Sequence, residues 1–166
     1  MRFMPGALAA ATVVLLLAAC GGGDGGAGDS GGAAEIPGDA DPEAARVIDE
    51  WSSALREGDV ATAADYFEVP SVAQNGTPPL QLSTREQVIA FNEALPCGAK
   101  LTEAEAVGRF TIASFELTER PGEGECGSGT GNTAKTAFVI EDGLIIEWVR
   151  VVNTDEAPSS ADEPIV

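Results

Sequence analysis

Histidine is absent from this sequence of 166 residues, and basic residues are scarce. The chain has nine Lys and Arg but 27 Asp and Glu, which gives a formal net charge of −18. The missing histidine removes the most common metal ligand and the usual proton acceptor near neutral pH. So few cations also exclude a protein that neutralises a run of nucleic-acid phosphates. We therefore expect no nucleic-acid partner, no bound metal and no cofactor.

Cysteine and long hydrophobic runs are scarce as well. The three cysteines form no Cys-x-x-Cys pair, which excludes zinc-finger and thioredoxin-like motifs. The apolar stretch from Phe3 to Ala19 has 17 residues and includes Pro5 and Gly6, whereas a transmembrane helix needs about 20. At 166 residues the chain has room for one domain of ordinary size. These absences leave an acidic protein with a single domain.

The N-terminal residues are arranged like an export signal, because a basic start, Met1-Arg2, precedes the apolar stretch. The sequence Leu17-Ala18-Ala19-Cys20 resembles the lipobox of bacterial lipoproteins. The resemblance implies that residues 1–19 are a signal peptide and that Cys20 carries lipid, with acyl chains such as palmitate. It also implies a location at the extracytoplasmic face of the cell membrane. A soluble secreted protein and a chance cysteine in an export signal are the alternatives.

Two segments of biased composition flank a central domain. Residues 20–40 are rich in glycine, which is typical of a flexible linker, so we expect a tether that begins at Cys20. Residues 154–166 are polar and contain proline, and we expect a disordered tail there. Residues 41–153 contain 19 acidic and 8 basic residues and are numerous enough for one hydrophobic core. We place the folded domain in this segment.

Three helices are predicted in the first half of the domain. An N-cap aspartate, a proline and an acidic residue at Asp41-Pro42-Glu43 start the first helix, and Gly58 ends it. The second helix is expected over Asp59–Phe67, and the third over Ser83–Leu95, where the first four residues form a capping box. The apolar residues of the first helix recur every three or four positions and form one stripe: Ala44, Val47, Ile48, Trp51, Ala54 and Leu55.

The second half of the domain has the pattern of β-strands. Two hairpins are expected, with turns at Val107–Arg109 and at Asp142-Gly143, and the second turn is a strong hairpin signal. Apolar residues at both odd and even positions of the last strand predict a central strand that is covered on both faces. The predicted strands are Ser71–Gln74, Leu80–Leu82, Lys100–Ala106, Phe110–Thr118, Ala134–Glu141 and Leu144–Val152.

Cys97 and Cys126 are predicted to form a disulfide, because disulfides persist in exported domains. The first hairpin places Cys97 near Arg120, and Cys126 lies shortly after Arg120 in the loop Glu119–Thr133. A redox-active thiol pair is the alternative, although the spacing of the two cysteines does not favour it. The acidic loop lacks the alternating ligand pattern of a calcium site, and we expect it to be flexible and solvated.

The order of these elements resembles the nuclear transport factor two-like superfamily. Three pieces carry the resemblance across nearly all of residues 41–153: the end of the second helix at Ala64–Phe67, the segment Leu82–Leu95, and the hairpin Asp142–Trp148. The resemblance implies an α+β fold in which N-terminal helices pack on a curved, mostly antiparallel sheet. In that superfamily the sheet wraps a long helix into a cone with an open mouth.

The resemblance leaves the function open. The superfamily includes ketosteroid isomerase-like and polyketide cyclase-like enzymes as well as many non-catalytic binding or assembly modules. Tyr66 falls near its inward-facing aromatic positions. The strand position where isomerases place a catalytic carboxylate falls at Gln74-Asn75, whose amides do not accept a proton at neutral pH. We therefore expect no catalytic residue and a lipid-anchored binding or interaction module.

A pocket inside the cone is the remaining candidate site. Packing in a filled core is the alternative for its aromatic residues, and a protein partner is the alternative to a small ligand. Catalysis would require Glu147 or Asp65 to be buried close to Tyr66. Glu147 and Arg150 are three residues apart on one strand, so at most one of them faces the interior. The expected lining for a small apolar ligand is Trp51, Tyr66, Asn75, Phe91, Phe110, Glu147 and Trp148.

Overall fold

The computed structural model describes residues 36–122 and 124–151. The predicted signal peptide, Cys20, the tail at residues 154–166 and most of the predicted linker lie outside this part of the chain. The described part contains three α-helices, one 3-10 turn (η1, Gly127–Gly129) and six strands. None of its helices is both long and apolar enough to cross a membrane.

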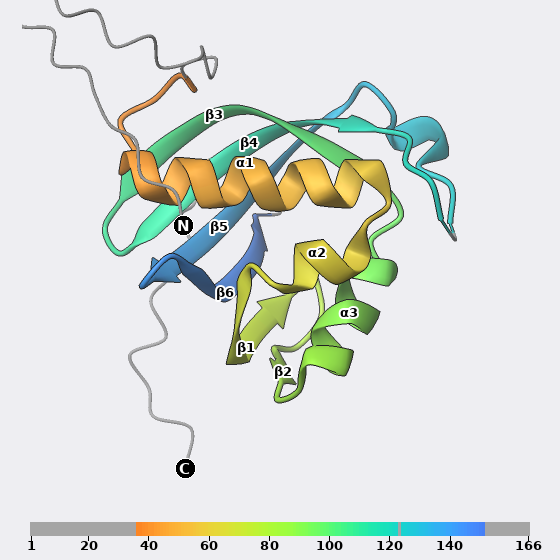
Figure 1. Ribbon diagram of the computed structural model, residues 1–166. Coiled ribbons are helices and arrows are strands. Elements are labelled where there is room, and N and C mark those ends of the chain that lie inside the picture. The colour runs from red at the N-terminus through yellow and green to blue at the C-terminus, as the bar shows by residue number, and fades with distance from the viewer. Residues whose placement is uncertain (1–35, 123, 152–166) are drawn as a thin grey trace, which may run out of the picture. The chain divides into compact units, whose positions relative to one another are not determined.

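The first helix, α1 (Pro42–Glu57), begins and ends where the sequence predicts. The Asp41 side chain accepts hydrogen bonds from the backbone N–H groups of Glu43 (2.9 Å) and Ala44 (3.1 Å), which have no partner within the helix. Gly58 ends the helix at φ 82°, a left-handed conformation that glycine adopts at little cost. The predicted apolar stripe is buried, and α1 lies along the sheet (Figure 1).

The second helix, α2 (Val60–Ala64), is shorter than predicted, because the chain that follows it joins the sheet. The Asp59 side chain caps the helix, as predicted. The Tyr66 carbonyl accepts a hydrogen bond from the backbone N–H of Ile145, 2.8 Å away, and Phe67 pairs with the same distant strand. The predicted extension of the helix through Phe67 is therefore wrong, since long-range strand pairing overrides a local helix preference.

The third helix, α3 (Arg85–Glu93), has its capping box one residue later than predicted. Thr84 is the N-cap in place of Ser83, and its hydroxyl accepts a hydrogen bond from the backbone N–H of Gln87 (3.3 Å). The Gln87 side chain in turn accepts a hydrogen bond from the backbone N–H of Ser83 (2.6 Å). The helix ends before Leu95, which is buried in the core. A glutamine thus replaces the predicted glutamate, and it accepts from the residue before the N-cap and not from the N-cap itself.

Six strands form one curved sheet in the order β2-β1-β6-β5-β4-β3. Neighbouring strands are antiparallel except β1 and β6, which are parallel. The sheet curves over α1, whereas α2 and α3 lie near β1 and β2 (Figure 1). The predicted class, helices on a curved and mostly antiparallel sheet, is confirmed. The strands are β1 (Phe67–Gln74), β2 (Leu80–Leu82), β3 (Gly98–Val107), β4 (Phe110–Thr118), β5 (Thr133–Glu141) and β6 (Leu144–Val151).

The two predicted hairpins are present, and β6 is a central strand, as predicted. Asp142 and Gly143 form the two-residue turn between β5 and β6 with φ of 50° and 77°, as a type I′ turn requires. The turn between β3 and β4 uses Gly108 at φ 60°. Both turns therefore close with residues that tolerate positive φ.

The first strand, β1, starts at Phe67 and not at the predicted Ser71. It continues through Pro70, whose peptide bond with Val69 is cis. Its register with β6 shifts between Phe67 and Val72, around the proline, because proline has no N–H to donate. The strand is longer than predicted since β6 pairs with Phe67 as well as with Val72–Gln74.

The outer edge of β3 is covered by the residues just before α1. The backbone N–H of Ala104 donates to the Pro37 carbonyl (2.9 Å), and the N–H of Ala40 donates to the Ala104 carbonyl (3.2 Å). Ile36 packs against the main core. The packed structure thus begins before the predicted start of the domain, because these residues satisfy an exposed strand edge.

Apolar side chains cover both faces of the sheet. The larger cluster lies between the sheet and the helices, where Trp51 makes edge-on contacts with three phenylalanine rings at centroid distances of 5.5 to 6.3 Å. Because side chains alternate along a strand, the second cluster lies on the opposite face. Its buried members are Phe110, Ile112, Ala137 and Val139. The central strand β6 contributes to both clusters, through Ile145 and Trp148 on one face and Ile146 and Val149 on the other.

Candidate functional site

A cavity of about 170 Å³ lies at one end of the sheet, where α1, β4 and β6 end and β5 begins. It is open to solvent on one side, and most of its wall is apolar. Trp51 and Leu55 of α1 form one side, and Phe115 and Leu117 of β4 form another. Leu95, which follows α3, completes the apolar wall. Segments that are distant in sequence therefore meet around one space.

Three of the seven residues predicted for a pocket line this cavity: Trp51, Asn75 and Trp148. Phe91 lies behind the wall, where its ring packs edge-on against Trp148 with the centroids 5.2 Å apart. The aromatic residues are thus part of the core and of the cavity wall at the same time. The structure places the other three predicted residues elsewhere: Tyr66, Phe110 and Glu147.

Tyr66 is half-buried outside the cavity, beside charged residues of α1. Burial, and then the negative charge of Glu50, raise the pKa of its hydroxyl. The neighbouring Asp65 is exposed and forms an ion pair with Arg85 at 2.7 Å. Neither Tyr66 nor Asp65 therefore reaches the space where a ligand would lie.

Phe110 and Glu147 lie on the other face of the sheet, away from the cavity. Phe110 belongs to the second apolar cluster, and the Arg109 guanidinium lies 4.6 Å from the centre of its ring. Arg109 also donates to both carboxylate oxygens of Glu147, at 2.7 and 3.0 Å. Glu147 is thus not a buried acid. Arg150, three residues later, lines the cavity, so only one member of this pair faces the interior, as predicted.

Three polar side chains interrupt the apolar lining: Asn75, Thr136 and Arg150. The ring of Trp148 also lines the cavity, but its indole N–H is buried and has no hydrogen-bond partner among the described residues. No Asp or Glu is among the described residues of the lining. The predicted lining included Glu147 and not Arg150, although the position of Arg150 two residues after Trp148 on one strand is the signal for a shared face.

The predicted Cys97–Cys126 disulfide is confirmed, and Cys97 lies in the cavity wall. The hairpin brings Cys97 to the end of β4, as predicted. The pairing of β3 with β4 differs from the predicted register by one residue, because Gly98 pairs with Thr118 and not with Glu119. The shift arises from a bulge in β3 that leaves Thr102 as the extra residue. The bridge joins two segments 29 residues apart, with the two Cα atoms 4.5 Å from each other.

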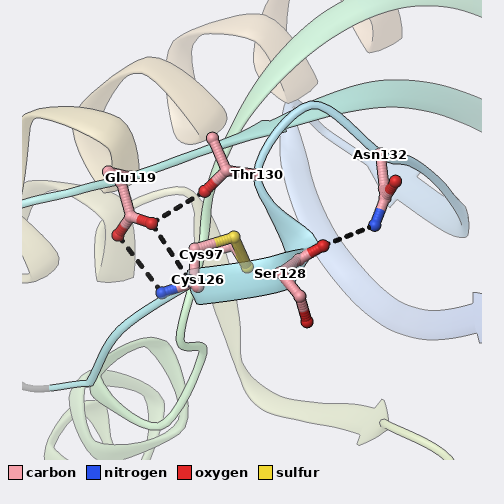
Figure 2. Close-up of a disulfide and its surroundings, with 7 residues drawn as sticks. Cys97, Glu119, Cys126, Ser128, Thr130 and Asn132 are labelled. Carbon is pink, nitrogen blue, oxygen red and sulfur yellow. Dashed lines mark hydrogen bonds between the residues drawn. A yellow bond between two sulfur atoms is a disulfide. The ribbon is translucent and has the colours of Figure 1, made fainter.

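Most described residues of the loop after β4 are exposed, as predicted, but side-chain hydrogen bonds hold the loop, which the sequence did not predict. The Glu119 carboxylate accepts hydrogen bonds from the backbone N–H groups of Cys126 (3.2 Å) and Gly127 (3.0 Å), and from the Thr130 hydroxyl at 2.7 Å (Figure 2). The Thr130 hydroxyl, followed by the two backbone N–H groups, lowers the pKa of Glu119. One acidic residue of the loop thus fixes the chain around the disulfide.

A second hollow, of about 280 Å³, lies at the opposite end of the sheet, between the start of α1 and the two hairpin turns. Its lining includes three acidic residues, Asp41, Glu43 and Asp142, together with Arg109. Asp41 already accepts the hydrogen bonds of the α1 cap. In residues 36–122 and 124–151, no three potential metal ligands are grouped together. The cavity at the disulfide end is therefore the stronger candidate for a ligand site.

Comparison with known proteins supports the fold. No protein-family model and no curated protein sequence matches the chain. A de novo designed protein with a curved β-sheet is similar, with a TM-score of 0.52 and 16% identity over 70% of this chain and 89% of its own. A candidate ketosteroid isomerase from Kribbella flavida has a TM-score of 0.50 and 15% identity over 75% and 87% of the two chains. An NTF2-like protein of unknown function from Cytophaga hutchinsonii has a TM-score of 0.50 and 12% identity over 72% and 92%.

These identities are low enough that the similarity concerns the fold alone. Together with the helix order and the curved sheet, it assigns the described residues to the nuclear transport factor two-like α+β fold. Within that fold, this chain has its cavity at the end of the sheet where α1 ends and the disulfide lies.

Proposed function

We propose that this domain is a non-catalytic module that binds a small, mostly apolar molecule, and that lipid on Cys20 holds it at the extracytoplasmic face of the cell membrane. The observation that carries the binding role is the cavity lining, with apolar walls and a few hydrogen-bonding groups. Ligand sites commonly combine these two features. The volume of about 170 Å³ is similar to that of an apolar cavity that accepts benzene.

The polar groups of the lining favour binding over catalysis. Proton transfer needs a group that gains or loses a proton near neutral pH, and the amide, hydroxyl, guanidinium and indole groups of this lining do not. The two acids considered for catalysis, Asp65 and Glu147, form ion pairs with arginines outside the cavity. These observations support a binding module over an isomerase-like or cyclase-like enzyme.

Ligand binding is testable with the two tryptophans of the chain, because Trp51 and Trp148 both line the cavity. Titration with a benzene-sized molecule such as benzyl alcohol is expected to change their fluorescence. An Ala134→Leu variant places a larger side chain in the lining and should abolish the change. Ala106→Leu, the same substitution at an exposed position of β3, is the matched control. A titration that leaves the unaltered protein unchanged by any such molecule would contradict the proposal.

The membrane anchor rests on the lipobox-like sequence Leu17–Cys20 and the apolar leader before it. Without the Cys20 sulfur no thioether can form, so a Cys20→Ala variant should leave the membrane fraction of cells that express the full chain. Gly22→Ala, just outside the lipobox, should remain in that fraction. Normal membrane retention of the Cys20→Ala variant would refute the anchor without affecting the binding role.

A further inference from the structure

We infer that the ligand of this cavity is a small carboxylic acid, with an apolar body inside and a carboxylate at the mouth that binds Arg150. The inference rests on the proposed binding function and specifies its ligand class. It follows from the position of Arg150, from its lack of a protein partner in the described residues, and from the balance of donors and acceptors in the lining.

Arg150 lies on the cavity face of β6, two residues after Trp148. Its cross-strand neighbour on β5 is Thr136, which also lines the cavity. On the other side of β6, the parallel strand β1 ends beside Val149 and continues into Asn75. Three adjacent strands therefore bring a guanidinium, a hydroxyl and an amide to the same end of the cavity. Arg150 is exposed, whereas Thr136 is buried, so the cation is at the solvent side.

Arg150 differs from every other arginine in the described part of the chain, because it alone has no ion pair or hydrogen bond with a described residue. Three of the others form ion pairs with carboxylates: Arg46, Arg85 and Arg109. The remaining two donate to backbone carbonyls: Arg56 and Arg120. In a domain with 19 acidic residues between positions 41 and 153, an arginine at a cavity mouth that has no such partner among the described residues is suited to an anionic ligand.

The lining offers more donors than acceptors. The guanidinium of Arg150 can only donate, whereas the hydroxyl of Thr136 and the amide of Asn75 can both donate and accept. A ligand that accepts hydrogen bonds therefore suits this lining better than one that only donates them. A carboxylate is an acceptor and carries the charge that complements Arg150. A cationic ligand would be repelled, and a hydrocarbon would leave the donors without partners.

The cavity volume limits the size of the acid. About 170 Å³ accommodates one aromatic ring or a chain of a few carbons, so benzoate is a suitable probe. Benzyl alcohol and benzylamine have nearly the same body, with a neutral and a cationic group in place of the carboxylate. The three molecules together separate the contribution of the apolar body from that of the charge.

The test is titration of the full-length protein with benzoate, benzyl alcohol and benzylamine at pH 7 and low salt, followed by tryptophan fluorescence and NMR. Benzoate is expected to bind at least about tenfold more tightly than the alcohol, and benzylamine more weakly than both. An Arg150→Gln variant should lose about tenfold in benzoate affinity and keep its affinity for the alcohol. Arg150→Lys should recover part of the loss, and Arg46→Gln should change neither affinity.

The outcomes distinguish this inference from the function on which it rests. Equal affinities for benzoate and benzyl alcohol, unchanged in Arg150→Gln, would overturn the acid as ligand class and leave apolar binding intact. An equal loss of both ligands in Arg150→Gln would also overturn it, because the arginine would then act on the shape of the cavity. The absence of binding by all three molecules would overturn the inference and the proposed function together.

Discussion

The two ends of the sheet are built in different ways. At the hairpin end, two tight turns and the start of α1 meet. Residues that are neighbours in sequence form each of these turns and the cap of the helix. At the cavity end, the walls come from α1, the chain after α3, and four different strands. That end depends on long-range links: the disulfide, and the buried Arg120, which donates to the carbonyls of Asn92 (3.1 Å) and Glu93 (2.9 Å).

This difference is consistent with the linings of the two hollows described above, mostly apolar at the disulfide end and partly charged at the hairpin end. Tight turns bring strand ends close together, and the hollow between them is lined by charged side chains. Long-range links hold distant segments in place without filling the space between them. The cavity end should therefore be more sensitive than the hairpin end to the loss of any one link. Two experiments test this expectation, and a third compares two residues within the cavity wall.

Removing the disulfide should have the largest effect. A bridge between residues 29 apart in sequence is expected to contribute about 3–4 kcal/mol through the entropy of the unfolded chain. The Cys97→Ser, Cys126→Ser double variant should lose this amount in urea denaturation, and reduction of the unaltered protein should reproduce the loss. Hydrogen exchange should accelerate most near Gly129 and Asn132, and least at the Asp142-Gly143 turn. Equal acceleration at both ends would remove the distinction between them.

The two tryptophans allow a finer test within the cavity wall. The Trp51 N–H donates to the side-chain oxygen of the fully buried Asn92 at 2.9 Å, whereas the Trp148 N–H has no described partner. Substitution by phenylalanine removes a similar volume at both sites, but only Trp51→Phe leaves a buried amide oxygen without its donor. Trp51→Phe should therefore cost about 1–3 kcal/mol more than Trp148→Phe in chemical denaturation. Equal costs would mean that the hydrogen bond to Asn92 adds no net stability.

Local signals in the sequence were sufficient for much of this structure. The limits of α1, the Asp142-Gly143 turn and the disulfide all depend on residues whose preferences act over a few positions or on one hairpin. The end of α2 was not predictable, because Phe67 pairs with a strand nearly 80 residues away. Phe110 was wrongly assigned to the pocket because apolar side chains cover both faces of this sheet, and the sequence does not show which face a given aromatic residue occupies. Arg150 was left out because alternation places it on the same face as Trp148, but only the fold shows that this face lines a cavity.

Glu119 provides the mildest way to weaken the cavity end, because pH alone can remove its charge. Its three hydrogen bonds lower its pKa in the folded protein below the ordinary glutamate value of 4.5. The stability that it adds is therefore present above the unfolded pKa and is lost as the pH falls through the lower folded value. The amide NMR signals of Cys126 and Gly127 should shift with an apparent pKa below 4.5, whereas the pH dependence of the Gly143 signal in the hairpin turn should be the same with and without the Glu119 carboxylate. In a Glu119→Gln variant no charge can be lost, so the same titration should be absent. If it persisted, a different carboxylate would be the one that holds the loop, and the link between this side chain and the disulfide end would have to be abandoned.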